Sequence, residues 1–254
     1  MARLTKEKLE NEFPVYLFKV SERKEYIDDL LNGNLYMNVS GYFRKLEDTY
    51  RGDKFDGRRP IDVSGCEIKL RSEDGVEIVL NRADSGMVGS FHTGFVGDDK
   101  IPMFCSGVLT ADIMEITGDE TFRIKKEYIE EWKKFGNYVA VISMGEMYEK
   151  LQAYHQANPT RAFLYGRVKY TDIMHEYSLT DYSKEDELGL YSSFFKKDLS
   201  YRFQNEWRIL MIGSEPFVPE NEDHAVVNVG KFEYGVSVNL NFFEEGEFRI
   251  EAEE

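Results

Sequence analysis

Residues 15–39 read VYLFKVSERKEYIDDLLNGNLYMNV, and their pattern predicts a strand, a helix and a second strand in quick succession. The apolar runs at 15–20 and 34–39 have the length and residue types of β-strands. Between them, about 22–32, apolar residues recur at helical spacing, and Gly33 supplies the left-handed position that often ends a helix. This opening unit predicts a fold in which helices and strands are interspersed.

The predicted helix has one apolar face. Tyr26 with Leu30, and Ile27 with Leu31, form pairs at the i,i+4 spacing that places side chains on the same side of a helix. Ser21 precedes the helix and is the expected N-cap, because a serine hydroxyl can accept a hydrogen bond from a free backbone N–H of the first turn.

Strands dominate the rest of the chain. Segments 66–71 and 76–80 flank the turn Glu73-Asp74-Gly75 and predict a hairpin. Further strands are expected at 101–106, 138–143, 162–171, 206–212, 225–229 and 234–240. Helices are expected near 126–135, 145–157 and around 187–200, and loops at 40–60 (with a short helix) and 81–100.

No repeat or linker divides the chain. We therefore expect a single α+β domain over residues 1–254, with a mostly antiparallel mixed sheet, interspersed helices and an acidic C-terminal tail over about 244–254.

The composition excludes several classes of protein. The 254 residues carry 32 Lys and Arg against 47 Asp and Glu, a net charge of −15, and 14% are aromatic. So many aromatic residues argue against a disordered acidic chain, and the excess of acid argues against a protein that coats nucleic acid.

Targeting signals and metal motifs are not evident in the sequence. Its two cysteines, Cys66 and Cys105, are too few for a disulfide framework, and no apolar run approaches the roughly 20 residues of a membrane span. Residues 1–12 lack the apolar core of a signal peptide, so we expect a cytoplasmic protein with no membrane partner. The four histidines are scattered and no paired-cysteine motif occurs, so no metal is expected.

Two segments are locally basic within this acidic chain. Residues 40–60 hold six basic residues against four acidic ones, and residues 196–208 hold four against two. These segments could form one pocket for an anionic, nucleotide-type small molecule. The alternative is that both are ordinary surface loops with charge pairs.

The strand expected at 206–212 places two charged residues together. With a period of two, Glu206 and Arg208 share one face and Trp207 lies on the other. If the Trp207 face is core, the pair lies on an open face or in a cleft. It is then either a surface ion pair of little energetic value or a carboxylate whose charge state is set by the guanidinium.

The closing part of the chain resembles a known family. The residues that carry this resemblance are Phe194-Phe195-Lys196-Lys197, Tyr201 and Gln204-Asn205-Glu206-Trp207-Arg208. They resemble the closing motif of a domain found in bacterial and phage proteins, a domain without an assigned activity. The opening at 15–38, the loop 48–57 and the segment 104–106 also fit, so the resemblance spans most of residues 15–212.

A more distant similarity, to ADP-ribosyltransferases, implies a chemistry. Gln204-x-Glu206 resembles the strand-borne Gln-x-Glu motif of that family, and DarT-type DNA-modifying toxins carry a comparable stretch. The resemblance implies NAD as a substrate, Glu206 as the catalytic carboxylate that stabilises the ribosyl cation, and Gln204 as the side chain that orients the acceptor. It implies a toxin or a factor in phage–host conflict, acting on a protein or on a nucleic-acid end.

The same resemblance suggests residues that bind the cofactor. Lys19 stands in the first strand, where the family presents Arg or His, and Tyr36 is placed in the tyrosine role of the His-Tyr-Glu type. Arg44, Arg51 and Arg208 are the candidates for binding the anionic ligand. The chain departs from the family at Lys19 and lacks a Ser-Thr-Ser strand before the glutamate.

Two other functions compete with this one. The net charge of −15 also suits a non-catalytic binding or inhibitor protein of phage or mobile-element origin. Asp62 followed by Glu67-Ile68-Lys69 resembles the Asp…Glu-x-Lys arrangement of Mg²⁺-dependent nucleases. Cys105 lies among apolar residues and is expected to be an inert thiol, with a nucleophile as the alternative.

Overall fold

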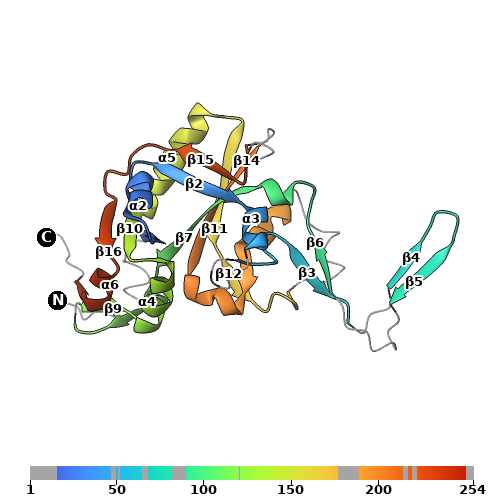
Figure 1. Ribbon diagram of the computed structural model, residues 1–254, viewed down its shortest axis with the longest axis horizontal. Coiled ribbons are helices and arrows are strands. Elements are labelled where there is room, and N and C mark those ends of the chain that lie inside the picture. Colours follow the sequence, from blue (N-terminus) through green and yellow to red (C-terminus); the bar gives the residue numbers. More distant parts are fainter. Residues whose placement is uncertain are drawn as a thin grey trace.

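The computed structural model describes residues 16–46, 50, 52–64, 68–81, 90–119, 121–176, 189–213, 217–218 and 222–249. Its centre is an eight-stranded sheet in which every neighbouring pair is antiparallel (Figure 1). With the surrounding helices, this confirms a mixed α+β fold with mostly antiparallel strands.

The long strand β7 (Pro102–Leu109) organises the sheet. On one side it pairs with β14 (Glu206–Gly213). On the other side β7 has two neighbours. Its first residues pair with β2 (Asn34–Val39) and its last residues pair with β1 (Tyr16–Ser21), so β1 and β2 share the same edge of β7. Beyond β1 lies β10 (Tyr138–Ser143), and the edge strands are β11 (Arg161–Arg167), β16 (Val236–Asn239) and β15 (His224–Asn228).

The opening unit forms as expected, as β1, α2 (Lys24–Leu31) and β2. Gly33, which follows the helix, has φ +92°, and a Cβ there would lie 2.3 Å from the Gly230 carbonyl oxygen. Only glycine therefore fits at this end of the helix. The expected N-cap at Ser21 is wrong, because Ser21 still pairs with Tyr138 in the sheet. The helix therefore begins later, after Arg23.

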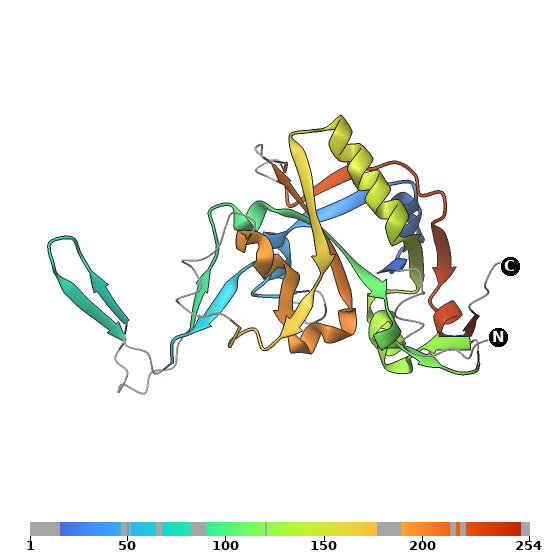
Figure 2. The same ribbon diagram turned by 180° about the vertical axis from the view of Figure 1, so that it is seen from behind.

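One face of the sheet is covered by α2 and by α5 (Met144–Ala157), which lies across it in Figure 2. Trp207 on β14 and Met147 on α5 are both buried in this core, so the Trp207 face of β14 is the core face. On α2, Ile27 is buried but Tyr26 is 59% exposed, so the apolar face is narrower than expected.

The other face carries two separate apolar clusters. One lies under α4 (Lys126–Trp132) and α6 (Asn241–Glu245) and includes Phe18. The second contains Phe194, from the 3₁₀ helix η5 (Gly189–Phe195), packed on Leu210. Small sheets border this face: β8 (Met114–Ile116) with β9 (Thr121–Ile124) and β17 (Phe248–Arg249), and β3 (Arg59–Asp62) with β6 (Ser90–Thr93).

Several expected boundaries are wrong. The strand expected at 162–171 is divided into β11 and β12 (Lys169–Thr171), because β12 leaves β14 and pairs in parallel with residues 196–198 instead. The helix expected around 187–200 is instead η5, β13 (Lys196–Asp198) and the 3₁₀ helix η6 (Leu199–Gln204).

Other elements follow the chain in between. The short helix expected in 40–60 is α3 (Ser40–Lys45), while the loop expected at 81–100 contains β6 and the 3₁₀ helix η1 (Asp98–Lys100). Two more short 3₁₀ helices are η2 (Ala111–Ile113) and η3 (Lys133–Phe135), which continues α4. Among the helices in the described ranges, none has both the length and the apolarity to cross a bilayer.

The expected hairpin is present as β4 (Ile68–Arg71) and β5 (Glu77–Asn81). It forms a two-stranded sheet of its own and projects away from the body (Figure 1).

Candidate functional site

Glu206 and Arg208 lie side by side on β14, as expected, but they are buried. Glu206 is 5% exposed and Arg208 is not exposed at all. In the pairing of β14 with β7, they lie opposite Gly107 and Cys105 and so share the face between the two apolar clusters. The pair is neither on an open face nor a surface ion pair.

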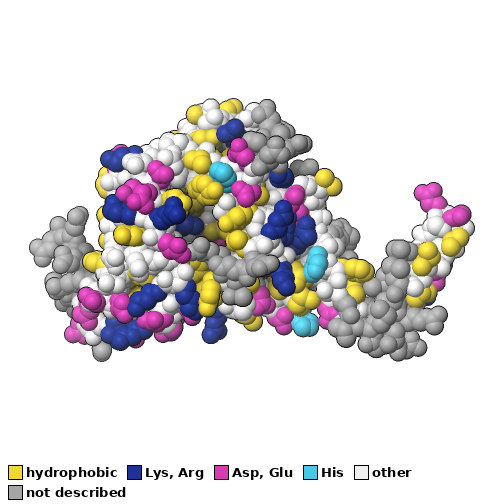
Figure 3. Space-filling model, viewed as in Figure 1, with side chains coloured by type: hydrophobic (Ala, Val, Ile, Leu, Met, Phe, Trp, Pro, Cys, Tyr) yellow, Lys and Arg dark blue, Asp and Glu magenta, His cyan; other side chains and the backbone are white. Residues whose placement is uncertain are grey.

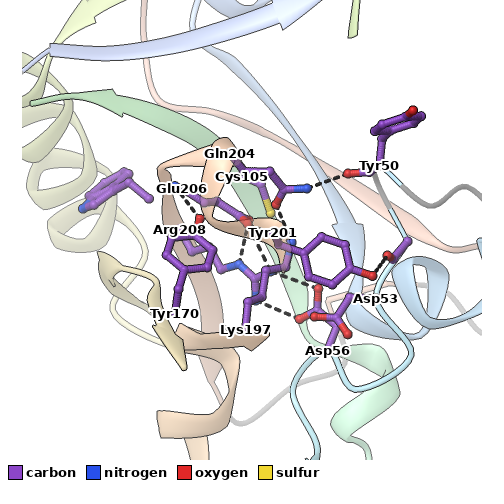
Figure 4. A network of polar contacts seen from close by, with 12 residues as sticks. Tyr50, Asp53, Asp56, Cys105, Tyr170, Lys197, Tyr201, Gln204, Glu206 and Arg208 are labelled. Atoms are coloured by element: carbon purple, nitrogen blue, oxygen red, sulfur yellow. Dashed lines mark hydrogen bonds and ion pairs between the residues drawn. The ribbon is translucent and has the colours of Figure 1, made fainter. Parts of the chain in front are cut away.

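The Arg208 guanidinium is held on all sides (Figure 4). Its Nε lies 2.7 Å from Glu206 Oε1, and its Nη1 and Nη2 lie 2.8 and 3.0 Å from the two carboxylate oxygens of Asp56. Nη1 also donates to the Phe194 carbonyl at 2.5 Å. The fork of the guanidinium matches the Asp56 carboxylate in the bidentate geometry that makes such pairs strong.

A second cation, Lys197, also contacts Glu206. Its Nζ lies 2.9 Å from Glu206 Oε2 and donates to Gln204 Oε1 at 2.7 Å, and its side chain is 3% exposed. Burial alone would raise the pKa of Glu206, but the charges of Arg208 and Lys197 and the Arg208 hydrogen bond outweigh it and hold the pKa well below its usual range. Glu206 is therefore a buried carboxylate that stays ionised.

Asp53 adds a fifth charged group beside these four. It is 4% exposed, and its Oδ1 accepts a hydrogen bond from the Phe55 N–H at 2.9 Å. Burial, and next the charge of Asp56, raise the pKa of Asp53 to about 6. We call Asp53, Asp56, Lys197, Glu206 and Arg208 the buried charge network.

The network contains two cations and two strongly paired carboxylates, Glu206 and Asp56, so their charges balance. Burial is the main reason that the Asp53 carboxyl keeps its proton to a higher pH, and the cations Lys197 and Arg208, which are paired with Glu206 and Asp56, offset it only in part.

Uncharged groups connect the network to its surroundings. The Glu206 N–H donates to Tyr170 Oη at 2.8 Å, Tyr201 Oη donates to the Gly52 carbonyl at 2.8 Å, and Gln204 Nε2 donates to the Tyr50 carbonyl at 2.5 Å. The two locally basic segments therefore meet, as the hypothesis of a shared pocket requires. Acidic residues lie between them, however, so their positive charges are largely neutralised.

Asn205 separates Gln204 from Glu206 and sets their directions. It is the one non-glycine residue with positive φ, +42°, among the residues the structure describes. Its amide Nδ2 donates to the Val108 carbonyl and to Thr110 Oγ1. This left-handed residue ends η6 and begins β14, which turns Glu206 inward.

The structure does not bring Lys19 to the face of Glu206. Phe18 and Glu206 both lie opposite Gly107, so they share a face, and Lys19, one residue later on β1, points to the other. Its Nζ donates to the Cys105 carbonyl at 2.5 Å and lies 5.3 Å from the centre of the Phe104 ring.

The other expected cofactor residues are found in different settings. Tyr36 is 52% exposed on β2, and its ring stacks on His224 with centroids 4.6 Å apart. Arg44 on α3 lies 3.0 Å from Asp98 Oδ1 and donates to the Asp56 carbonyl at 2.8 Å, so it adjoins the buried charge network. Arg51 lies outside the described residues.

Burial and the charge of Glu206 raise the pKa of the Cys105 thiol, in line with an inert cysteine rather than a nucleophile.

The residues of the nuclease hypothesis are not shown together. Asp62 is exposed on β3, Lys69 lies on the separate hairpin, and Glu67 falls outside the described residues. Within the described ranges, no group of three His, Cys, Asp or Glu side chains is arranged to hold a metal ion.

Sequence reasoning selected Glu206, Gln204 and Arg208 but gave Tyr170, Lys197 and Asp53 no place in the site. Lys197 stood in the closing motif and Asp53 in the polar loop, yet nothing local showed that Lys197 contacts Glu206 or that Asp53 lies beside Asp56.

The arrangement provides a fixed anion, an adjacent amide and a carboxyl group that exchanges its proton near pH 6. Figure 3 shows a hollow near the centre of the body, with side chains of both signs interspersed around it. Comparisons with protein-family models, with curated proteins and with solved structures found no match to this chain.

Proposed function

We propose that the chain is an ADP-ribosyltransferase-like transferase that takes NAD as a substrate. The observation that carries this proposal is Glu206, a carboxylate held ionised in a buried site beside Gln204. A fixed carboxylate in a region of low dielectric stabilises a developing positive charge far more than one in water. The ribosyl cation that forms as nicotinamide leaves is such a charge.

The reaction needs one anion and one proton acceptor. The bond between ribose C1′ and the nicotinamide nitrogen breaks, and nicotinamide leaves with the electron pair. A lone pair of the acceptor then forms the new bond to C1′, and the acceptor loses its proton. With a pKa of about 6, Asp53 is the carboxylate of the network suited to take up that proton near neutral pH.

Ligand binding has to free one oxygen of Glu206. Oε1 accepts from Arg208 and Oε2 contacts Lys197. Arg208 is also clamped by both oxygens of Asp56, whereas the Lys197 ammonium sits on a flexible stem. We therefore propose that a ribose hydroxyl replaces Lys197 at Glu206, while Gln204 orients the acceptor.

The test is transfer of label from NAD to components of a cell extract. Glu206→Gln is the active-site variant, and Glu176→Gln is its matched control. Glu176 also pairs with a lysine, Lys196, at 2.8 Å, but lies outside the network. Wild type and Glu176→Gln should transfer label, and Glu206→Gln should lose about 100-fold or more of the rate.

Folding has to be checked beside activity, because removing one partner of a buried ion pair costs about 3–5 kcal/mol. The rates should be compared at a temperature at which circular dichroism shows both variants folded. Equal labelling by wild type and Glu206→Gln, or labelling by neither, would refute the assignment.

A second function is favoured by a different observation. Both oxygens of Glu206 are already bonded and the residue is 5% exposed, an arrangement that also suits a purely structural ion-pair network. On this view the chain is a non-catalytic binding or inhibitor protein whose net charge of −15 engages a basic partner. Its capture of that partner should weaken steeply with salt and survive Glu206→Gln.

A further inference from the structure

A single ammonium group contacts both side chains assigned to the proposed reaction. Lys197 Nζ lies 2.9 Å from Glu206 Oε2 and donates to Gln204 Oε1 at 2.7 Å. In this position Lys197 competes with any ligand for both oxygens. The position of Lys197 therefore decides whether the two side chains are available.

Of the two cations in the buried charge network, Lys197 is the one that is free to move. The Arg208 guanidinium bonds both carboxylate oxygens of Asp56, Glu206 Oε1 and the Phe194 carbonyl. The Lys197 ammonium has fewer bonds to lose and stands at the end of a flexible four-carbon stem. Its strand, β13, belongs to a sheet of only two strands, which restrains it less than a strand of the central sheet.

Asp53 offers a second position for this ammonium. The residue is 4% exposed, and its Oδ1 accepts a hydrogen bond from the Phe55 N–H at 2.9 Å. Among the residues that the structure describes, no hydrogen bond or ion pair reaches Asp53 Oδ2. Buried polar atoms in proteins nearly always have a partner, so Oδ2 is an unused acceptor beside a cation that can move.

Tyr201 connects the two positions. Its ring centre lies 5.1 Å from Lys197 Nζ, and its hydroxyl donates to the carbonyl of Gly52, the residue before Asp53 (Figure 4). The face of an aromatic ring attracts an ammonium group. The ring therefore provides a favourable surface along the way from Glu206 to Asp53.

We propose that Lys197 moves between two positions and that the proton on Asp53 selects between them. While Asp53 is protonated, Lys197 stays in the closed position, on Glu206 and Gln204. When Asp53 releases its proton to solvent, Lys197 keeps its own proton and moves to Asp53 Oδ2, the open position, which frees Glu206 Oε2 and Gln204 Oε1. The movement needs no ligand, but its effect on NAD rests on the proposed function.

The groups around Asp53 set the pH at which Lys197 moves. Burial and the charge of Asp56 hold the Asp53 proton, and the charges of Lys197 and Arg208 oppose them, which gives a pKa of about 6. The closed position should therefore prevail at pH 5 and the open position at pH 8. The other titratable or charged groups that adjoin this loop are Arg44 on α3, Cys105 on β7, Tyr201 on η6 and Glu206 on β14, while His92 on β6 contacts the Phe55 ring.

The open position also changes the charge of the network in a useful direction. With Asp53 protonated, Lys197 and Arg208 balance Glu206 and Asp56. With Asp53 ionised, the network has one negative charge in excess. This is the sign that stabilises a ribosyl cation, so the site would open and become anionic in one step.

Crystal structures of the ligand-free protein at pH 5 and pH 8 test the movement directly. At pH 5, Lys197 Nζ should lie within hydrogen-bond distance of Glu206 Oε2. At pH 8, it should lie within hydrogen-bond distance of Asp53 Oδ2 instead. A pH 8 structure in which Lys197 remains on Glu206, or does not contact Asp53, would overturn the proposal.

Side-chain NMR follows the same movement in solution, through the ¹⁵Nζ signal of Lys197 and the carboxyl ¹³C signal of Glu206. In wild type both should show one transition near pH 6. Asp53→Asn has no proton to lose there and should show none, whereas Asp62→Asn, the same change at an exposed aspartate, should behave as wild type. A wild-type Lys197 signal without the transition, or an Asp53→Asn variant that keeps it, would refute the movement.

Neither measurement uses NAD, so the two proposals can fail separately. If Lys197 moves but no label is transferred from NAD, the proposed function is wrong and the movement stands. If label is transferred but Lys197 stays on Glu206 at pH 8, the movement is wrong and the function stands.

Discussion

At Asp53, burial disfavours the charged form of the carboxyl group. The side chain is 4% exposed beside a set of charges that already balances, and its pKa is about 6 in the folded protein against 3.8 for the free group. The folded state therefore holds the Asp53 proton more tightly than the unfolded state does. Its contribution to stability is fully present below pH 3.8 and is lost as the pH rises through 6.

We predict that Asp53→Asn stabilises the protein at neutral pH. Asparagine keeps an oxygen that can accept from the Phe55 N–H but carries no charge to bury. The gain in free energy of unfolding should reach about 3 kcal/mol at pH 7–8, since one pKa unit corresponds to about 1.36 kcal/mol, and should vanish near pH 4. Urea unfolding at a series of pH values measures it.

Asp62→Asn is the matched control for this variant. Asp62 also accepts from the N–H two residues ahead, that of Ser64 at 2.8 Å, but it is exposed and its hydrogen bonds to Ser64 lower its pKa. This control should show no gain at neutral pH. A pH-independent effect of Asp53→Asn would contradict the account of its buried charge.

Single residues also show how far the sequence leads at the site. The period of two placed Glu206 and Arg208 side by side, and this is confirmed. Their burial could not be predicted, because the carboxylate that clamps Arg208 belongs to Asp56, which lies 152 residues away along the chain. Charge patterning within one segment does not reveal a partner brought in by tertiary packing.

At the scale of elements, the turn at Asn205 sets the direction in which β14 begins. Its φ of +42° is one that asparagine tolerates better than most residues, and its amide holds the Val108 carbonyl. The turn thus combines a backbone preference with side-chain bonds that tie η6 to β7.

Replacing Asn205 separates these two contributions. Asn205→Gly removes the side-chain bonds but keeps the left-handed backbone available, whereas Asn205→Ala removes the bonds and adds the left-handed strain. Alanine should therefore be the more destabilising variant, by about 1–2 kcal/mol in unfolding free energy. Chemical denaturation of both variants checks this. A glycine variant as unstable as the alanine variant would show that strain at this turn is unimportant.

The elements predicted best are those with strong internal patterns. The strand predicted at 138–143 has the same bounds as β10, and the helix predicted at 145–157 begins one residue later than α5. Both predictions succeed because apolar side chains alternate in the strand and recur at helical spacing in the helix. The strands β3, β6 and β13 were missed, since each is short and pairs with a distant segment. Where pairing rather than local pattern makes a strand, the sequence of that segment carries little signal.

At the scale of the whole molecule, the net charge of −15 does not arise in the buried charge network. The buried charge network contains nearly balanced charges, with Lys197 and Arg208 set against Glu206 and Asp56. Most of the excess acid therefore belongs elsewhere in the chain. If NAD binds as proposed, its cationic nicotinamide ring and anionic diphosphate would meet groups of both signs in the network.

The hairpin β4–β5 and the body should be energetically separate. The side chains at 76–79 are exposed, and no hairpin residue whose side chain the structure describes belongs to an apolar core cluster. Replacing residues 68–81 by a short Gly-Ser linker should therefore change the unfolding free energy of the body by no more than about 0.5 kcal/mol relative to wild type. Urea denaturation followed by tryptophan fluorescence measures it, since Trp132 and Trp207 are both buried in the body. A loss of several kcal/mol would mean that the hairpin packs against the body and contributes to its core.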